Sequence, residues 1–251
     1  MNAQPAVSAR DPRVLRAAEL LRRDSPEPAV ALDGPELIDA ALAEGLVLEF
    51  VLAAEPEEWL IRTEAPVAAA SPDALRALGA LGQPADVVAV AALPAPPLPG
   101  LPADAIVLAD VGDAGNVGSI LRSAAAFGAP RAILSGACAD PWSRRALRAA
   151  VGASLRPGLV ARAASLAEIA AWDGRAPLAA ALPRGGVEPH LLPEGTAIVV
   201  GGERHGLSPA DRALCDLAVT IPATGFESLN VAAAAAVLLA PRPLGTRARR
   251  P

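Results

Sequence analysis

The stretch from Asp110 to Ala129 constrains the fold of this chain more than any other. It follows the aliphatic run 105–109, which is short enough to be a buried strand. Three glycines then indicate a turn, and the apolar residues that follow recur with a helical period up to Gly128. We therefore expect a strand, a glycine-rich turn and a helix that begins near Asn116.

A turn of this kind is a candidate site, because it leaves backbone N–H groups open at the start of a helix. Asn116 and Arg122 are the only strongly functional side chains between the turn and the end of the helix. Together they offer an amide and a permanent cation to a ligand in the same crevice.

Composition and charge divide the chain into two parts. With 251 residues and 53% apolar content, one or two domains with a sizeable core are expected. Residues 1–100 hold 7 arginines against 15 acidic residues, whereas residues 101–251 hold 15 arginines against 12. If the partner is a polyanion, we expect the second half to carry the contact.

Several classes of protein are disfavoured. No run approaches the roughly 20 apolar residues of a membrane span. The two cysteines and two histidines show no spacing typical of a metal site or a disulfide framework. Since the N-terminus also lacks an apolar leader segment, we expect a cytoplasmic protein without metal or membrane partners.

Strand and helix patterns alternate in the first ninety residues, which indicates a small α/β domain. The helix expected first has Asp11 as its N-cap and Val14, Leu15, Ala18 and Leu21 on its buried face. The expected strands are 29–34, 46–53, 66–70 and 87–92, and the helices are 11–23, 35–44 and 73–81. Five prolines in residues 93–102 then indicate a semi-rigid linker. The predicted domains are therefore 1–92 and 103–251, joined by the linker 93–102.

The second half predicts a parallel sheet with helices on both faces, because its strands are continuous aliphatic runs. The expected strands are 105–109, 131–135, 159–162, 178–182, 197–201 and 217–221, and further helices are 140–151, 165–172 and 231–240. Three unusual loops, at 110–118, 201–206 and 222–230, follow the carboxyl ends of predicted strands. Ligands bind at that edge of such sheets, so the loops are expected to converge on one pocket.

These loops carry three ordered motifs: N-x-G-x-x-x-R, G-x-E-x-x-G and I-P followed by G and S-L-N-V. The residues are Asn116, Gly118 and Arg122; Gly201, Glu203 and Gly206; and Ile221, Pro222, Gly225, Ser228, Leu229, Asn230 and Val231. In order, spacing and context the trio resembles the SpoU (TrmH) branch of the SPOUT RNA methyltransferases. The first half is similar, more loosely, to the small L30e-like substrate-binding domain that many members carry.

The resemblance implies S-adenosylmethionine-dependent 2′-O-methylation of a ribose in structured RNA, ribosomal RNA being favoured over transfer RNA. It also implies a trefoil-knotted α/β catalytic domain, which general rules of chain topology would not suggest. Members of the family act as homodimers whose active site draws on both subunits. The alternative is a member of the same fold that binds RNA, or assists ribosome assembly, without catalysis.

The resemblance and the chemistry together assign roles to the motif residues. A ribose hydroxyl needs a proton acceptor and a clamp on the adjacent phosphate, and Arg122 suits the clamp; whether it is also the base stays open. Gly118 would leave room for RNA beside it. The catalytic candidates are Asn116, Arg122, Glu203, Ser228 and Asn230. The cofactor-binding candidates are Gly201, Gly202, Glu203, Gly206, Ile221, Pro222, Ser228, Leu229 and Asn230.

Simpler explanations remain for some of these residues. Asn116, and Ser228 or Asn230, could be helix N-caps. The arginines of helix 140–151 (Arg144, Arg145 and Arg148) are either a solvated helix face or, with Arg122, an RNA contact. An unrelated dinucleotide-binding enzyme is ranked last, because the glycine spacing is not G-x-G-x-x-G.

Overall fold

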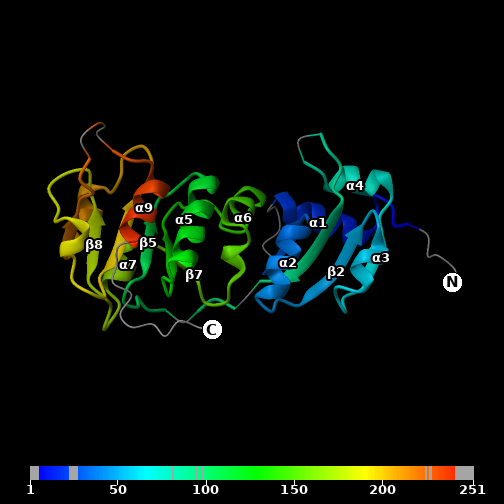
Figure 1. Ribbon diagram of the computed structural model, residues 1–251, viewed down its shortest axis with the longest axis horizontal. Coiled ribbons are helices and arrows are strands. Elements are labelled where there is room, and N and C mark those ends of the chain that lie inside the picture. The colour runs from blue at the N-terminus through cyan, green and yellow to red at the C-terminus, as the bar shows by residue number, and fades with distance from the viewer. Residues whose placement is uncertain are drawn as a thin grey trace. The chain divides into compact units, whose positions relative to one another are not determined.

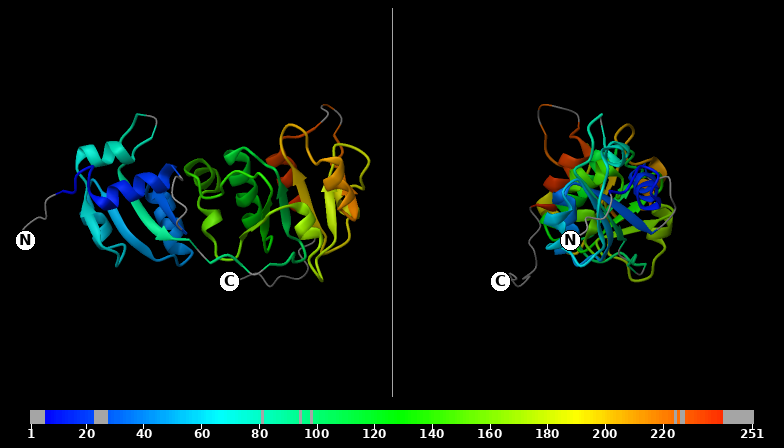
Figure 2. Two further views of the ribbon diagram at one scale, coloured as in Figure 1. Left: turned by 180° about the vertical axis from the view of Figure 1, so that it is seen from behind. Right: turned by 90° about the vertical axis from the view of Figure 1, so that its right-hand side faces the viewer.

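A computed structural model describes residues 6–22, 28–80, 82–93, 95–97, 99–223, 225 and 228–240 (Figures 1 and 2). Its chain forms two compact units, Met1–Ala95 with Pro141–Pro157, and Pro96–Asp140 with Gly158–Pro251. The domain limits expected from the sequence differ from this grouping for residues 141–157. None of the described helices is long and apolar enough to cross a membrane.

The first unit is built on a four-stranded sheet in the order β1-β4-β2-β3. Both β1 and β2 pair antiparallel with β4, and β2 pairs parallel with β3. The strands are β1 Ala29–Asp33, β2 Leu48–Ala53, β3 Val67–Ala69 and β4 Val87–Ala92. The helices are α1 Pro12–Arg22, α2 Pro35–Ala43, α3 Pro56–Leu60, α4 Pro72–Leu78 and α6 Arg144–Ala150, with a short 3₁₀ turn η1 at Ala153–Leu155.

Side chains from alternate positions of β1 enter two different cores, as the pleat of a strand requires. Ala29 and Ala31 pack with α1 and α4, whereas Val30 and Leu32 pack with α2. The second core also contains Leu147, which explains why α6 groups with the first unit although it lies far along the chain.

The buried face of α1 agrees with the prediction at Val14, Ala18 and Leu21 but not at Leu15. Leu15 is 52% exposed, whereas Ala17 and Leu20 are buried beside Val14. The interpretation from sequence gave alanine too little weight, because it contributes little to a hydrophobic pattern.

The second unit is built on a six-stranded sheet in the order β10-β8-β9-β5-β6-β7. All its pairings are parallel, so the predicted parallel sheet is confirmed. The strands are β5 Ile106–Ala109, β6 Ala132–Ser135, β7 Val160–Ala163, β8 Leu178–Ala181, β9 Ala197–Gly201 and β10 Leu217–Val219. The helices are α5 Ala114–Ala126, α7 Leu166–Ala170, α8 Pro209–Ala213 and α9 Val231–Leu239, with a 3₁₀ turn η2 at Pro189–Leu191.

The strand order reverses between β5 and β9, which is where open parallel sheets place their ligand sites. Helix α9 lies beside α5 (Figures 1 and 2) and also contacts β9. The sequence did not predict α3 and α8, because each has only five residues and too short a span to show periodicity.

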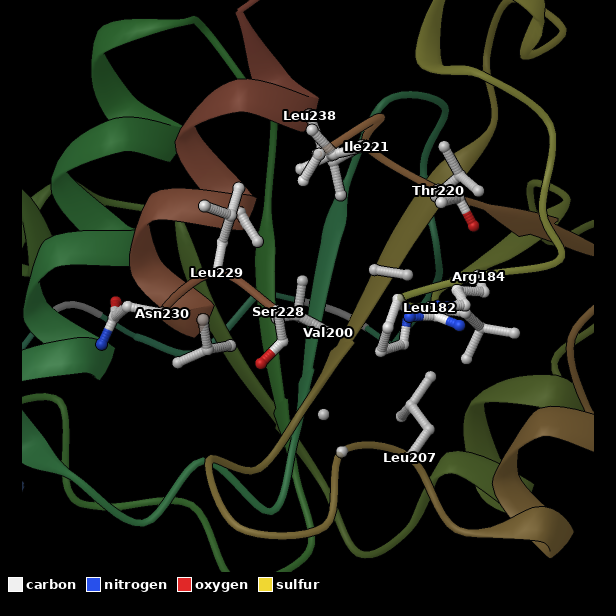
Figure 3. Close-up of a pocket in the computed structure, with 18 of the residues that line it drawn as sticks. Leu182, Arg184, Val200, Leu207, Thr220, Ile221, Ser228, Leu229, Asn230 and Leu238 are labelled. Atoms are coloured by element: carbon white, nitrogen blue, oxygen red, sulfur yellow. The ribbon is translucent and has the colours of Figure 1, made fainter. Parts of the chain in front are cut away.

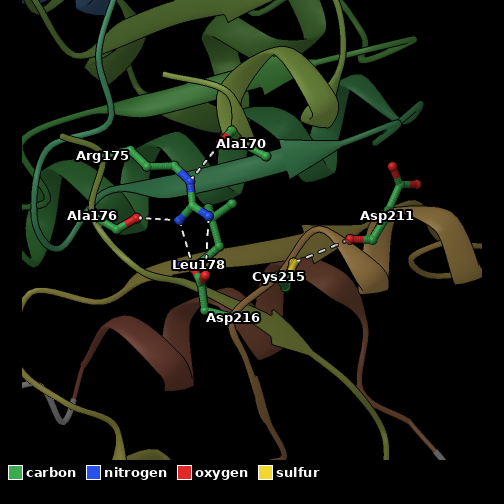
Figure 4. Close-up of polar contacts among 7 residues, drawn as sticks. All are labelled: Ala170, Arg175, Ala176, Leu178, Asp211, Cys215 and Asp216. Atoms are coloured by element: carbon green, nitrogen blue, oxygen red, sulfur yellow. Dashed lines mark hydrogen bonds and ion pairs between the residues drawn. The ribbon is translucent and has the colours of Figure 1, made fainter. Parts of the chain in front are cut away.

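An ion pair ties β8 to the segment before β10 at the amino ends of these strands (Figure 4). Arg175 donates to both carboxylate oxygens of Asp216, at 2.7 and 3.2 Å, and also to the carbonyl oxygens of Ala170 and Ala176. Asp216 also accepts the backbone N–H of Leu178 at 2.8 Å. The hydrogen bond from Arg175 is the main reason that the pKa of Asp216 is lowered.

Asp216→Asn is expected to lower the free energy of unfolding by about 1 kcal/mol at pH 7, since Asp216 is half exposed and solvent weakens the pair. A depressed folded-state pKa stabilises the protein above the unfolded pKa of about 3.9, and this stabilisation is lost as the pH falls through the folded value. The difference in the free energy of unfolding between the wild type and Asp216→Asn, measured by urea unfolding, should therefore become smaller below about pH 4. A gap that does not change with pH would contradict the role of the charge.

Candidate active site at the carboxyl edge of the parallel sheet

Loops that follow three strands of the second unit meet at the carboxyl edge of the sheet, as predicted. They follow β5, β9 and β10, and each carries one of the three motifs. Because all three strands are parallel, their ends lie on the same side.

The loop after β5 ends in a helix cap that the sequence placed three residues too late. Asp113 is the N-cap of α5, and its carboxylate accepts the backbone N–H of Asn116 at 2.9 Å. Asn116 therefore lies inside the first turn, which leaves its side chain available for another contact. The helix begins near Asn116 as predicted, at Ala114, but its N-cap is Asp113 rather than Asn116, because aspartate caps a helix as well as asparagine does.

A hydrogen-bonded network joins the three motif loops. The side-chain N–H of Asn116 donates to Oε1 of Glu203 at 2.8 Å. The side-chain oxygen Oδ1 of Asn116 accepts the side-chain N–H of Asn230 at 3.2 Å. Glu203 also accepts the backbone N–H groups of Gly112 and Asp113, both at 3.2 Å. Asn116, from the first motif, thus joins Glu203 of the second motif to Asn230 of the third.

Asn230 has a second role as the N-cap of α9, as the sequence suggested. Its side-chain oxygen accepts the backbone N–H groups of Ala232 and Ala233, at 2.8 and 3.3 Å. Its amide group remains for Asn116, so capping and membership of the network are compatible.

The network keeps Glu203 ionised. Burial alone raises the pKa of its carboxyl, but the hydrogen bonds from Asn116 and from backbone N–H groups outweigh that effect and hold the pKa below its usual value. Because all of these partners donate, the carboxylate is matched to them only in its charged form.

The loop after β9 folds back so tightly that glycine is required at its start. A Cβ atom added at Gly201 would lie 2.3 Å from the carbonyl carbon of Gly206 and 2.4 Å from the backbone nitrogen of Leu207. Gly202 and Gly206 pair with each other across the turn. The motif glycines therefore set the path of the backbone along the wall of the site.

Gly201→Ala is expected to force this turn open and to weaken ligand binding in the adjoining pocket at least tenfold, because the clashing atoms are backbone and cannot rotate away. Gly158→Ala is the comparison, since a Cβ there meets nothing within 4 Å and Gly158 does not line the pocket, although its φ of 79° adds strain. Titration calorimetry measures the ligand affinity of both variants. Equal affinities for Gly201→Ala and the wild type would show that the turn does not shape the pocket.

A pocket of about 800 Å³ lies between the loops after β8, β9 and β10 (Figure 3). Its apolar wall is formed by side chains such as Val200, Leu207, Ile221, Leu229 and Leu238. All of the residues predicted to bind the cofactor line it: Gly201, Gly202, Glu203, Gly206, Ile221, Pro222, Ser228, Leu229 and Asn230.

The stretch around Asp110–Ala129 contributes no lining residue to this pocket. Asn116 reaches the pocket only through Glu203 and Asn230. Arg122 is exposed on α5, and no hydrogen bond or ion pair joins it to any residue that the structure describes. Gly118 is buried, so it does not leave room for RNA as predicted but lies inside the packed unit.

The arginines of α6 make contacts within the first unit. Arg144 donates to Asp33 at 2.8 Å and to the carbonyl oxygens of Leu78 and Gly79, and Arg148 also pairs with Asp33. These contacts hold α6 against β1, a role that neither alternative from the sequence included. RNA contact by Arg145 and Arg148, which are exposed, stays a prediction.

The loop after β8 is the part of the site that the sequence analysis missed. It contributes Leu182, Pro183, Arg184 and Gly185 to the pocket. The signal was present, because this loop also follows the carboxyl end of a predicted strand, but it carries no motif residue that draws attention. His205 lines the pocket from the turn after β9 and is exposed.

Both cysteines, Cys138 and Cys215, are free and partly buried. Cys138 donates to the carbonyl oxygens of Leu108 and Ser135, and partial burial raises the pKa of its thiol. Burial likewise raises the pKa of Cys215 to about 11. Both thiols are thus protonated and poorly nucleophilic at neutral pH.

The parallel sheet, the glycine loops and the pocket define an α/β protein with a ligand site at the carboxyl edge of its sheet. Residues 104–240 match the SpoU rRNA Methylase family, and the chain belongs to this family. A similar protein from Streptomyces viridochromogenes, a 23S rRNA (uridine(2479)-2′-O)-methyltransferase, is 35% identical over 49% of this chain and 46% of its own length. The chain thus spans about half the length of the curated relatives that it matches.

Solved structures resemble nearly the whole chain. The SpoU methyltransferase AviRb from Streptomyces viridochromogenes, in complex with AdoMet, has a TM-score of 0.79 at 29% identity and covers 92% of this chain and 96% of its own. An RNA 2′-O ribose methyltransferase has a TM-score of 0.75 at 30% identity, covering 94% and 96%. The fold class expected from the motifs is confirmed, whereas the knot and the L30e-like character of the first unit stay predictions.

Proposed function

We propose that the protein transfers a methyl group from S-adenosylmethionine to the 2′-hydroxyl of a ribose in structured RNA, with ribosomal RNA as the favoured substrate. The observation that carries the proposal is the network of Asn116, Glu203 and Asn230 beside the pocket. It brings together one residue from each family motif, as an intact catalytic site requires. A member that had lost catalysis would be under no constraint to keep all three.

The pocket fits S-adenosylmethionine in size and chemistry. It has the volume of a small-molecule site, and its aliphatic wall suits the flat adenine ring. Backbone groups of Gly201, Ile221 and Leu229 would hold the polar edge of that ring. When bound, the cofactor supplies an electrophilic methyl group on a sulfonium ion.

The residues of this chain would position the ribose and receive its proton. Arg122 offers a bidentate cation to the phosphate next to the target ribose, and it is the candidate base. Asn116, Ser228 and Asn230 would orient the ribose or the arginine. Glu203 would hold the loops in register rather than contact RNA, since its oxygens are already occupied.

The site is expected to be completed by a second copy of the chain. Arg122 does not line the pocket of its own chain, so a clamp near the cofactor would come from the partner subunit. Helix α9 has no polar side chain, and Ala233, Val237 and Ala240 form an exposed stripe along it. An apolar stripe of this kind is typical of a covered helix face.

Val237→Glu is expected to convert a dimer into a monomer and to lower activity at least tenfold, because Val237 is 42% exposed in a single chain and a charge there would be buried in a dimer. Light scattering coupled to size-exclusion chromatography gives the mass of each protein. Val187→Glu introduces the same charge at a position that is 40% exposed but lies outside α9, so it should leave the mass unchanged. A monomeric wild type would rule out the shared site.

One assay distinguishes ribosomal RNA from transfer RNA as the substrate, and methyl transfer from RNA binding without catalysis. Purified protein is incubated with S-adenosylmethionine carrying a labelled methyl group and with either ribosomal RNA or transfer RNA that lacks modifications. Label in ribosomal RNA alone supports the proposal, whereas label in transfer RNA alone would show that transfer RNA is the substrate. RNA binding without label, when calorimetry detects cofactor binding, would favour an inactive assembly factor.

Location in the cytoplasm belongs to the same proposal, because it is where these RNAs are made and modified in bacteria.

A further inference from the structure

Arg184 is a cation of the pocket wall to which neither the family motifs nor the network assigns a role. It lies in the loop after β8, next to Leu182, and its side chain is exposed. No hydrogen bond or ion pair joins it to another residue among those that the structure describes. By contrast, Arg212, which also lines the pocket, already donates its Nε to the carbonyl oxygen of Leu207 at 2.9 Å.

The two sides of the pocket differ in polarity (Figure 3). Ser228, Leu229 and Asn230 lie on one side, and Asn230 is joined through Asn116 to the carboxylate of Glu203. Arg184 and Thr220 lie on the other side, across the aliphatic wall (Figure 3). The pocket therefore presents an anion and amides on one side and Arg184 on the other, while Arg204, on the turn after β9, is a further exposed cation of its lining.

A ligand matched to this arrangement carries a positive centre at one place and a carboxylate at another, with an apolar part between the walls. S-adenosylmethionine has these features, because its amino acid tail ends in a carboxylate and its sulfur is a cation. A guanidinium binds a carboxylate through two parallel N–H···O bonds, which fixes direction as well as adding affinity.

We propose that Arg184 binds the carboxylate of S-adenosylmethionine and so fixes the orientation of its amino acid tail. The inference rests on the proposed function, because it requires that this cofactor is the ligand of the pocket. Arg184 is then a cofactor-positioning residue on the loop after β8. The role belongs to a part of the site that the three motifs do not include.

Titration calorimetry with two ligands tests this pairing. S-adenosylmethionine and its decarboxylated form share the adenosine, the sulfonium and the amine, and differ in the carboxylate. Arg184→Gln should weaken binding of S-adenosylmethionine about tenfold, the loss of one charge-assisted pair. The same variant should bind the decarboxylated ligand about as well as the wild type does. Retained binding of the second ligand also shows that the variant is folded.

Arg204→Gln removes the same charge from the turn after β9, where Arg204 also lines the pocket with an exposed side chain, so this variant tests whether Arg184 rather than Arg204 pairs with the carboxylate. It should not discriminate between the two ligands, whereas Arg184→Lys should restore part of the preference for the carboxylate. Equal losses for both ligands in Arg184→Gln, or no loss for either, would overturn the assignment to the carboxylate while leaving the proposed function intact. A wild-type protein that binds neither ligand would overturn the proposed function and this inference with it.

Discussion

Replacing Arg122 by alanine is expected to lower kcat for methyl transfer by about 100-fold or more, while the Kd for S-adenosylmethionine stays within about twofold. The first expectation follows because loss of a phosphate clamp or of a proton acceptor removes an interaction that acts on the reacting ribose. The second follows because Arg122 lies outside the lining of the pocket in its own chain. Single-turnover transfer to ribosomal RNA and titration calorimetry measure the two quantities separately.

Arg122→Lys tests whether the planar guanidinium of Arg122 is required or only its positive charge. It should recover only part of the rate, because lysine cannot form the planar pair that arginine forms with phosphate. Arg76→Ala is the surface control, since Arg76 is 63% exposed in the first unit and far from the motif loops in the sequence. Normal turnover by Arg122→Ala would show that the residue is an ordinary surface arginine.

Glu203→Gln is expected to have the second-largest effect, lowering kcat/KM by about 10- to 100-fold. The carboxylate accepts three hydrogen bonds from the loop after β5 and the first turn of α5, and a glutamine amide would turn a donor toward one of those N–H groups. The mismatch would loosen Asn116 and, through it, Asn230. Steady-state kinetics with ribosomal RNA measures the effect, and a thermal melt confirms that the variant is folded.

Glu194→Gln is the matched control for Glu203, because it is an exposed acid on the turn before β9, at the opposite end of that strand from the pocket. It should leave kcat/KM unchanged. If Glu203→Gln also left kcat/KM unchanged, the network would be a packing feature rather than a support for catalysis.

Some of the site could be predicted because local sequence determines it. Short aliphatic runs followed by glycine-rich turns predicted β5, β9 and the loops that follow them. The rule that parallel strands end at one edge then brought the three motifs together before any contact was known. The close approach of Gly201 to Gly206 is the physical reason that the motif contains glycine.

Other features depend on contacts between segments that are distant in the sequence. Leu147 joins the core of the first unit although the proline-rich segment suggested a boundary long before it. The buried side of α1 was decided by the close packing of Ala17, and the buried position of Gly118 by the packing of its helix within the second unit. Arg184 was missed because its loop has no special composition; only the order of the strands places it at the pocket.

The central claim is that the pocket and the network of Asn116, Glu203 and Asn230 serve methyl transfer to a ribose. The most direct measurement is nucleoside analysis by mass spectrometry after the purified protein has acted on unmodified ribosomal RNA with isotopically labelled S-adenosylmethionine. The account predicts one labelled 2′-O-methylnucleoside, which is absent when Arg122→Ala replaces the wild type. Label on a base, or no label although the cofactor binds, would contradict it.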